Sequence, residues 1–457
     1  MTAVILSRDE LRRLVDAAEI DTVIVAFADM QGRLVGKRIS ARFFLEEAAD
    51  TGAECCNYLL AVDVDMNTVE GYAISGWDTG YGDMVMKPDL TTLRQLPWLP
   101  GTALVLADVV RHDGGVIEPA PRRILQRQLD QLRESGLQAY AATELEFIVF
   151  EDTYRQAWAN GYRGLIPASD YNMDYAVMAS SRIEPLLRSI RQHMQGAGLR
   201  WEAVKGECNR GQQELGFGYD EALTTCDNHA IYKNGAKEIA DQHSKSLTFM
   251  SKYDEREGNS CHIHLSLRSL EGSPVFAGDG QPMGMSPMFR NFVAGLLATL
   301  SEMTLFFAPN INSYKRFADQ SFAPTVVAWG VDNRTCALRV VGHGDGMRVE
   351  CRVPGGDVNQ YLAVAALIAG GLHGIDRELP LPEPCTGNAY QLEEDDATQR
   401  LPGTLAEAAT LFGASTVARQ AFGDEVVDHY VNNARIEVAA FNAAVTDWER
   451  VRGFERF

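Results

Sequence analysis

The sequence lacks the short motifs by which many proteins bind nucleotides or metals. Its 457 residues contain neither a G-x-x-x-x-G-K-[ST] loop nor a G-x-G-x-x-G turn, so P-loop and Rossmann binding of nucleotides are unsupported. Any nucleotide phosphates would have to meet metal ions and arginines instead. The eight cysteines include no C-x-x-C pair, which leaves zinc and redox motifs without support and predicts reduced thiols in the cytoplasm.

An excess of positive charge and a long apolar run are also missing. The chain has 42 Lys and Arg against 62 Asp and Glu, a formal charge of −20, which disfavours binding to nucleic acid or an anionic membrane surface. Residues 1–13 reach charged residues before an apolar core can develop, so we expect no secretion signal. The longest apolar tract, Phe292 to Phe307, is interrupted at Ser301 and Glu302, is too short to span a bilayer and predicts a buried helix.

The length predicts more than one folding unit, because 457 residues exceed the size at which a single core stops growing. Strand-like segments separated by Pro and Gly continue to about Arg111, and Asp113-Gly114-Gly115 then looks like a linker. We therefore predict two domains, residues 1–112 and residues 113–457.

Local patterns predict a mixture of helices and strands. Ser7 and Glu10 form a capping box at the start of a helix. A hairpin is predicted from Thr22 to Ile39, with Asp29 at the end of its first strand. In the second domain we expect helices over 121–135, 182–195 and 228–249, a long strand over 137–150, and strands around Glu202, Glu214, His262 and Glu350.

The long strand carries two acids on one face. Side chains alternate along a strand, so Glu144 and Glu146 point the same way within an otherwise apolar segment. Unpaired like charges at that spacing repel, and a bound cation would compensate them. A solvated strand face is the equally good alternative for this strand taken alone.

Further metal-ligand types follow along the chain. Glu207 and Glu214 supply acids, and His262 and His264 place two imidazoles on one strand face. Oxygen donors outnumber nitrogens, which favours Mg²⁺ or Mn²⁺ over tetrahedral zinc. For His262 alone, a hydrogen-bonded structural histidine is the stronger interpretation.

Arginines gather in one segment of this acidic chain. Their guanidinium groups suit phosphates and carboxylates, although for the arginines alone surface ion pairs with Asp319, Asp332 and Asp345 are the stronger interpretation. The arginines between residues 316 and 352 are Arg316, Arg334, Arg339, Arg348 and Arg352.

Taken together, these motifs resemble the glutamine synthetase family of the bacterial class I type over nearly the whole chain. The matching segments are Glu144-Leu145-Glu146-Phe147, Glu207 with Gly211-Gln212-Gln213-Glu214, His262-Ile263-His264-Leu265-Ser266, Asn312-Ser313-Tyr314-Lys315-Arg316, Asn333-Arg334 through Arg339, Arg348-Val349-Glu350-Cys351-Arg352, and Asn359 to Leu367. Their order and spacing both agree with the family.

The resemblance implies roles for individual residues. One metal ion would be bound by Glu146, Glu207 and Glu214, and a second, which bridges the phosphates of ATP, by Glu144, His262 and Glu350. Glutamate and the transferring phosphoryl group would contact Gly258, Arg316, Arg334 and Arg352, of which Arg316 and Arg334 would also act in catalysis. ATP would contact His264, Ser266, Arg339 and Arg348.

The implied reaction activates the γ-carboxylate of glutamate with ATP as an acyl phosphate, which an amine then attacks. Metal ions and arginines neutralise the charge on the transferring phosphoryl group. Only a neutral amine is nucleophilic, so a base must take its proton, and Asp29 in the family's D-x-x-G turn is the candidate.

One departure from the family concerns the acceptor. Ammonia-using members carry a glutamate in a G-x-E-x-P stretch, whereas this chain has Phe322 there. An aromatic side chain suits an alkylated amine better than ammonium. We therefore predict a γ-glutamylamide synthetase for ethanolamine-like amines or polyamines. Ordinary glutamine synthetase and a catalytically silent regulatory homologue are the alternatives.

Fold and assembly follow from the same resemblance. It implies an α+β protein, with an N-terminal β-grasp-like domain and a catalytic domain built on a curved antiparallel sheet. It also implies a homo-oligomeric ring, a dodecamer, with sites between neighbouring subunits. Tyr390 aligns with the tyrosine that regulated members adenylylate, but its neighbours differ, so we expect no modification.

Overall fold

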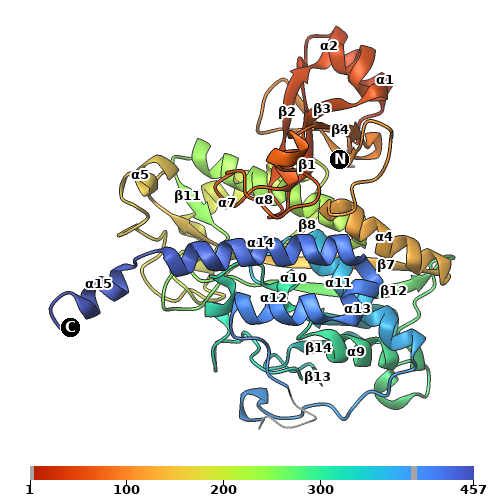
Figure 1. Ribbon diagram of the computed structural model, residues 1–457, viewed down its shortest axis with the longest axis vertical. Coiled ribbons are helices and arrows are strands. Elements are labelled where there is room, and N and C mark those ends of the chain that lie inside the picture. Colours follow the sequence, from red (N-terminus) through yellow and green to blue (C-terminus); the bar gives the residue numbers. More distant parts are fainter. Residues whose placement is uncertain (1–4, 393–398) are drawn as a thin grey trace.

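The computed structural model describes residues 5–392 and 399–457 and shows two β-sheets with helices around them (Figure 1). The smaller sheet lies in the upper, N-terminal part of the molecule in this view, and the larger sheet lies in the body. The α+β class predicted from the sequence is confirmed.

The N-terminal sheet has six strands in the order β2-β1-β6-β4-β3, with β5 paired to β6. Its hairpin forms as predicted, and Ser7 and Glu10 cap the first helix. Strand β1 also pairs in parallel with β6, which brings the two ends of this region together. The elements are α1 (Arg8–Asp16), β1 (Thr22–Ala28), β2 (Leu34–Ser40), α2 (Ala41–Phe43), α3 (Ala49–Thr51), β3 (Ala53–Cys56), β4 (Asp83–Pro88), β5 (Arg94–Gln95) and β6 (Thr102–Val110).

The larger sheet has nine strands in the order β13-β14-β15-β12-β7-β9-β8, with β10 and β11 also paired to β7. All pairs are antiparallel except β13 with β14. The strands are β7 (Leu137–Phe150), β8 (Trp201–Gly206), β9 (Gln212–Phe217), β10 (Asp220–Glu221), β11 (Ser246–Thr248), β12 (Cys261–Ser269), β13 (Trp329–Val331), β14 (Leu338–Val341) and β15 (Arg348–Cys351). The predicted domain boundary at residue 112 falls between the two sheets and stays a prediction.

Helices surround this sheet, and α11 forms the centre of the helical core because nearly all of its residues are buried. It approaches α9 closely: a Cβ at Gly295 would lie 2.2 Å from the carbonyl oxygen of Gly370, so glycine is required there. The helices are α4 (Pro121–Glu134), α5 (Tyr154–Ala159), α6 (Val177–Arg182), α7 (Glu184–Gly196), α8 (Ala222–Gln242), α9 (Pro287–Thr299), α10 (Thr304–Phe307), α11 (Gln360–Asp376), α12 (Leu405–Ala414), α13 (Thr416–Phe422), α14 (Asp424–Ala443) and α15 (Asp447–Gly453).

Two of the predicted helices differ from those observed. The helix expected over 228–249 begins at Ala222 and ends at Gln242, because Ser244 adopts a left-handed φ of 55° and the chain then enters β11. The tract from Phe292 to Phe307 is buried but forms two helices, not one. It breaks at the polar pair, where the Ser301 hydroxyl donates to Arg400 O and the Glu302 carboxylate accepts from the Ser415 hydroxyl.

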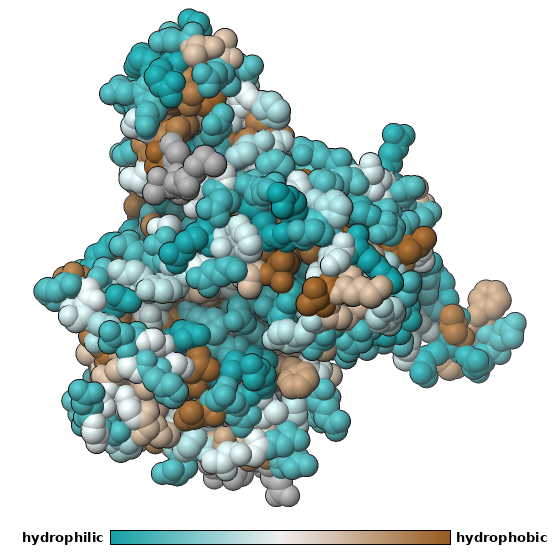
Figure 2. Space-filling view, turned by 180° about the vertical axis from the view of Figure 1, so that it is seen from behind, coloured by the Kyte–Doolittle hydropathy of each residue, from teal (hydrophilic) through white to brown (hydrophobic). Residues whose placement is uncertain are grey.

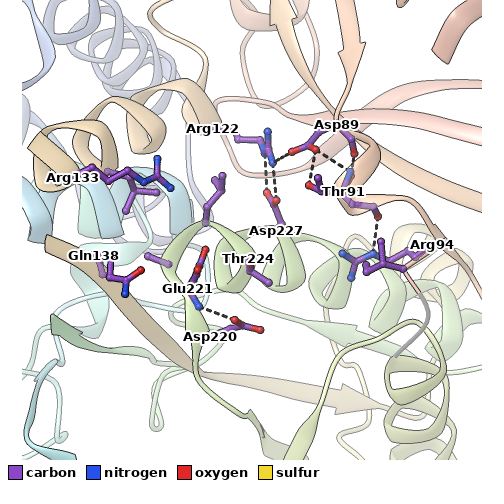
Figure 3. A pocket seen from close by; sticks show the side chains of 16 residues that line it. Asp89, Thr91, Arg94, Arg122, Arg133, Gln138, Asp220, Glu221, Thr224 and Asp227 are labelled. Carbon is purple, nitrogen blue, oxygen red and sulfur yellow. Dashed lines mark hydrogen bonds and ion pairs between the residues drawn. The ribbon is translucent and has the colours of Figure 1, made fainter. Parts of the chain in front are cut away.

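A buried ion network joins the N-terminal region to helices α4 and α8. The guanidinium of Arg122 on α4 binds Asp89 and Asp108 from the N-terminal region and Asp227 from α8, at 2.7 to 2.9 Å. Figure 3 shows Arg122 between Asp89 and Asp227, above the N-terminal end of α8. The hydroxyl of Tyr361 also donates to Asp227, so this buried carboxylate is paired on both sides.

The surface is mostly hydrophilic, as expected for a strongly acidic chain (Figure 2). One departure is the C-terminal helix α15, which extends away from the body in Figure 1. Trp448, Val451, Phe454 and Phe457 are all exposed on or just after this helix. Among the described residues, no helix has both the length and the apolar character needed to cross a bilayer.

Candidate active site

The strand register of the larger sheet gathers the predicted ligands. Alternation along β7 points Glu144 and Glu146 to one face, while Leu145 on the opposite face is buried in the core. Adjacent strands then supply partners at the same level of the sheet. The facing pairs are His262 with Glu144, His264 with Glu350, Glu146 with Glu214, and Arg339 with Glu350.

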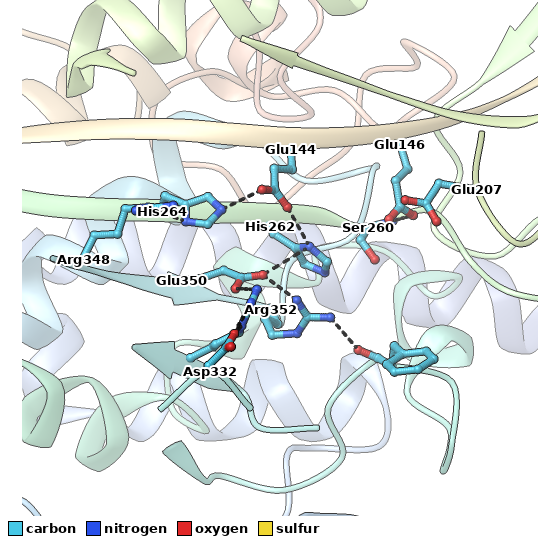
Figure 4. Close-up of polar contacts among 12 residues, drawn as sticks. Glu144, Glu146, Glu207, Ser260, His262, His264, Asp332, Arg348, Glu350 and Arg352 are labelled. Carbon is cyan, nitrogen blue, oxygen red and sulfur yellow. Dashed lines mark hydrogen bonds and ion pairs between the residues drawn. The ribbon is translucent and has the colours of Figure 1, made fainter. Parts of the chain in front are cut away.

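These side chains form two groups that could each hold a metal ion. In each group one ligand atom per residue lies within 4.8 Å of the others. The first group is Glu146, Glu207 and Glu214, and the second is Glu144, His264 and Glu350. Figure 4 shows the second group on the left, next to His262, with Glu146 and Glu207 close together on the right.

The all-carboxylate group matches the set predicted for the first metal ion. Burial, and then repulsion from Glu144 and Glu146, raises the pKa of Glu214 to about 8. Burial also raises the pKa of Glu146, and the neighbouring Glu207 adds to the effect. Lys205 offsets part of this charge by pairing with Glu207, and a hard divalent cation fits the three crowded carboxylates as a donor set.

The second group contains His264, and His262, the histidine predicted for this ion, lies next to the group (Figure 4). His262 Nδ1 lies 3.3 Å from Glu144 and 3.5 Å from Glu350, whereas His264 Nε2 lies 2.9 Å from Glu144. Arg348 Nε donates to His264 Nδ1, which assigns the ring proton of His264 to Nε2 and directs it at Glu144. His262 Nε2 is buried with no hydrogen-bond partner among the described residues, and a buried nitrogen of this kind suits a metal ion or another ligand.

Charge in the second group is balanced by the neighbours. Burial favours the neutral form of Glu144, but hydrogen bonds from His262 and His264 outweigh it and lower the pKa of this carboxyl. Burial, followed by the charge of Arg352, lowers the pKa of His262 to about 4. The fully buried Glu350 accepts from Arg339 at 2.8 Å and from Arg352 at 2.5 Å.

Arg316 is buried between the glycine-containing loop and the end of β15. It donates to Val353 O at 2.8 Å, to Arg352 O at 3.0 Å and to the Ser260 hydroxyl at 3.1 Å. Gly258 packs on its side chain, and a Cβ there would lie 2.2 Å from Ser251 O, so only glycine fits. The predicted glutamate contacts Gly258 and Arg316 therefore lie together.

This loop also connects to the first metal group. Ser260 N donates to Glu146 at 2.7 Å, and Gln212 Nε2 bridges Glu146 and Gly258 O. Substrate contacts and metal ligands are thus held by one hydrogen-bond network.

The remaining predicted residues are more peripheral. Arg334 is exposed in the turn between β13 and β14, and Ser266 is half-buried on β12. Phe322 is 57% exposed, and its carbonyl oxygen lies 3.5 Å from Arg352 Nη2. Arg352 therefore contacts both the second metal group and the backbone of the predicted acceptor residue.

Asp29 lies in the turn between β1 and β2 and is completely buried. Its carboxylate accepts from the backbone of Gln31 and Arg33 and from Arg33 Nε at 2.7 to 3.0 Å. Burial raises the pKa of Asp29, although Arg33 acts in the opposite direction. The turn accounts for every one of these contacts, and a role for Asp29 as the base stays a prediction.

Sequence reasoning missed Lys205. Its ammonium group pairs with Glu207 and lies 3.8 Å from Asp174 and 4.5 Å from the centre of the Tyr175 ring. Asp174 and Cys208 join Glu207 in a third possible metal-binding group. The spacing in the sequence could have indicated this ion pair. Lys205 and Glu207 are two residues apart at the end of a strand, so their side chains share a face.

Comparisons with known proteins agree with the family resemblance seen in the sequence. A model of the glutamine synthetase catalytic domain matches residues 118–452. The γ-glutamylethanolamide synthetase GlnA4 of Streptomyces coelicolor is 61% identical, and the match covers 99% of this chain and 96% of that protein. A glutamate–isopropylamine ligase from a Pseudomonas species is 37% identical over 97% of each chain. Among solved structures, a GmaS/ADP complex matches 97% of this chain and 99% of its own with a TM-score of 0.85 and 27% identity.

Proposed function

This chain belongs to the glutamine synthetase family, and we propose that it joins glutamate to a small primary amine through a γ-glutamyl phosphate intermediate. It is a ligase that forms a carbon–nitrogen bond between glutamate and an amine at the expense of ATP. The acceptor we propose is ethanolamine-like or a polyamine. The observation that carries this choice is Phe322, exposed beside Arg352, where the family pattern for ammonia has an acid.

Two relatives support an organic acceptor, since the name of one specifies a γ-glutamylethanolamide product and the name of the other specifies isopropylamine as a substrate. A carboxylate at the acceptor site attracts ammonium through charge, whereas an aromatic ring offers contact area to carbon atoms. Phe322 therefore favours an amine that carries an alkyl group over bare ammonium.

The described residues fit two divalent metal ions, for which we propose Mg²⁺ or Mn²⁺. Glu146, Glu207 and Glu214 would hold one ion, and Glu144 and Glu350 with a histidine would hold the other. When bound, the ions would neutralise charge on the phosphates of ATP and on the transferring phosphoryl group. The orphaned Nε2 of His262 and the crowded carboxylates are the observations that support this fit.

The protein's own residues would then position and shield the reactants. We propose that Arg316 and Gly258 orient glutamate, while Arg334, Arg339, Arg348 and Arg352 contact phosphate or carboxylate oxygens, and His264 and Ser266 lie beside the nucleotide. An oxygen of the γ-carboxylate attacks the terminal phosphorus of ATP, and ADP leaves. The amine nitrogen then attacks the acyl carbon, phosphate leaves, and a base, for which Asp29 is the proposed residue, takes the amine proton.

We further propose that the enzyme works in the cytoplasm as a ring-shaped homo-oligomer, a dodecamer. Eight free cysteines suit a reducing compartment. The exposed apolar side chains of α15, which extends from the body, suit burial against a second copy of the chain.

One assay tests the proposed acceptor. Purified enzyme is given ATP, Mg²⁺ and glutamate with ammonium, methylamine, isopropylamine, ethanolamine or putrescine at equal concentration, and phosphate release is followed while products are identified by mass. We expect a γ-glutamylamide to form fastest with an organic amine. Faster formation of glutamine than of every amide would overturn the proposal.

A further inference from the structure

The segment that carries Phe322 has an unusual backbone. Gln320 and Phe322 adopt φ values of 61° and 57°, in the left-handed region that large side chains rarely enter. Such conformations cost free energy and persist only where the surroundings hold them. The ring of Phe322 is mostly exposed, so its packing within the described chain does not hold the segment.

Hydrogen bonds supply the restraint instead. Within the segment, the Ser321 hydroxyl donates to Ala318 O and the Thr325 hydroxyl donates to Asp319. From a distant part of the chain, the Tyr390 hydroxyl donates to Ala323 O at 2.9 Å. This contact meets the backbone one residue after Phe322 and is shorter than the 3.5 Å contact from Arg352 to Phe322 O.

Tyr390 is itself firmly positioned. It lies on a short 3₁₀ turn, Ala389–Gln391, that Asn388 caps by accepting from Tyr390 N. Ala389 N donates to the Thr335 hydroxyl at 2.9 Å, and Asn333 Nδ2 donates to Gly387 O at 2.8 Å. Asn333 and Thr335 flank Arg334, so Tyr390 links the acceptor segment to the turn that carries a proposed phosphate contact.

We propose that Tyr390 is a positioning residue for the acceptor: its hydroxyl fixes the backbone at Ala323 and thereby sets where the Phe322 ring meets the amine. The inference rests on the proposed function, because that function places Phe322 in the acceptor site. Displacements of about 1 Å in a positioning group are enough to lower rates substantially. Tyr390 acts only through Phe322, and activation of glutamate does not depend on it.

Removal of one oxygen atom tests the proposal. Tyr390→Phe keeps the ring and deletes the bond to Ala323 O. We expect the KM for the acceptor to rise about fivefold, the effect of one ordinary hydrogen bond, while the KM for glutamate is unchanged. Because a misplaced amine attacks slowly, phosphate released without amide formation should also increase.

Tyr154→Phe is the matched control. The Tyr154 hydroxyl donates to Leu247 O at 3.0 Å and accepts from Leu247 N at 3.3 Å, in a part of the fold that is not involved in the acceptor segment. Tyr154→Phe should therefore lose at least as much stability as Tyr390→Phe. Hydrogen exchange of the amides in residues 318–324 should increase in Tyr390→Phe and stay at the wild-type rate in Tyr154→Phe.

The outcomes separate this inference from the proposed function. If wild-type enzyme makes glutamine fastest, the organic acceptor is wrong, and the role of Tyr390 is then judged on the KM for ammonium. The inference would be overturned if Tyr390→Phe had the wild-type KM for the acceptor, the wild-type ratio of amide formed to phosphate released, and wild-type hydrogen exchange. A loss of stability in Tyr390→Phe with no change in acceptor KM would likewise reduce Tyr390 to a structural role.

Discussion

The metal-ligand region and the acceptor segment are built in opposite ways. Glu144 and Glu146 stand on β7 and Glu350 stands on β15, two strands that both pair with β12, and Glu350 is entirely buried. Phe322 stands on an irregular segment, with a left-handed backbone and a side chain that is 57% exposed. The first region is fixed by strand register and the second by a few side-chain hydrogen bonds.

This difference separates the chemistry from the choice of substrate. Metal and phosphate groups need positions accurate to a fraction of an ångström, which paired strands supply. A surface segment tolerates substitution more readily than the sheet, so the acceptor can change while activation of glutamate is kept. Arg352 is where the two regions meet, since it contacts both Glu350 and Phe322 O.

The largest expected effect comes from the strand-borne acids. Glu144→Gln and Glu146→Gln should each lower kcat by roughly a hundredfold or more, since each removes charge that holds a metal ion against a polyanionic transition state. Both variants should fold, because glutamine has nearly the same shape as glutamate. The measurement is steady-state phosphate release at saturating Mg²⁺, together with circular dichroism.

Glu202→Gln is the control for these two variants, because Glu202 is an exposed acid on β8 that belongs to neither metal group. It should retain wild-type activity. Near-normal turnover in both Glu144→Gln and Glu146→Gln would refute the metal assignment and, with it, the contrast between the two regions.

A smaller effect is expected at the residue that joins the regions. Arg352→Lys keeps the charge but cannot contact Glu350 and Phe322 O at once, so both glutamate activation and acceptor use should suffer. Loss of charge-assisted hydrogen bonds worth about 2 kcal/mol predicts a roughly 30-fold fall in kcat/KM for glutamate and for the amine. If only one of the two substrates is affected, Arg352 belongs to one region alone.

The strand-borne region was largely predictable from sequence, and the reason is periodicity. Alternation along β7 and β12 is enough to place Glu144 with Glu146, and His262 with His264, on shared strand faces. The grouping of residues from different strands, such as Glu350 with Glu144 and His262, came from the family resemblance, since strand order is a long-range property that local patterns do not encode.

The irregular parts were less predictable. No local pattern indicates that Tyr390 bonds to Ala323, because 67 residues separate them. For Asp29 the local pattern is visible but has two interpretations. The aspartate of a D-x-x-G turn accepts hydrogen bonds from the turn's own backbone, so the pattern does not distinguish a structural aspartate from a catalytic base. The helix end at Ser244 was missed because a serine in the left-handed region leaves no glycine signal.

The acceptor segment should respond selectively. Phe322→Glu should lower kcat/KM for the preferred organic amine by roughly tenfold, within the ~1–3 kcal/mol of one hydrophobic contact, and leave the KM for glutamate nearly unchanged. Weak activity with ammonium should rise. Competition between ethanolamine and ammonium in one reaction, with both products counted, gives the ratio of the two kcat/KM values directly. If this ratio is the same in wild type and Phe322→Glu, Phe322 does not select the acceptor.

The smallest expected effect is on thermal stability and distinguishes the regions without an activity assay. Burial and neighbouring acids raise the pKa of Glu214 to about 8, so the folded protein binds this proton more tightly than the unfolded chain. That contribution to stability is complete below the ordinary carboxyl pKa and is lost as the pH rises through about 8. After treatment with EDTA, the Tm should therefore fall by a few degrees between about pH 5.5 and about pH 8.5.

Added Mg²⁺ should remove most of this dependence of Tm on pH. A cation that binds only the folded state stabilises it most at the higher pH, where the carboxylates are ionised. Glu214→Gln lacks the titrating group, so its slope without metal should be flatter and its response to Mg²⁺ smaller. Phe322→Glu should keep the wild-type slope, since its segment contributes no ligand to either group. If Tm falls with pH equally in wild type and Glu214→Gln, the crowded acids do not govern stability. The electrostatic reason for treating the strand-borne region as a metal site would then be lost.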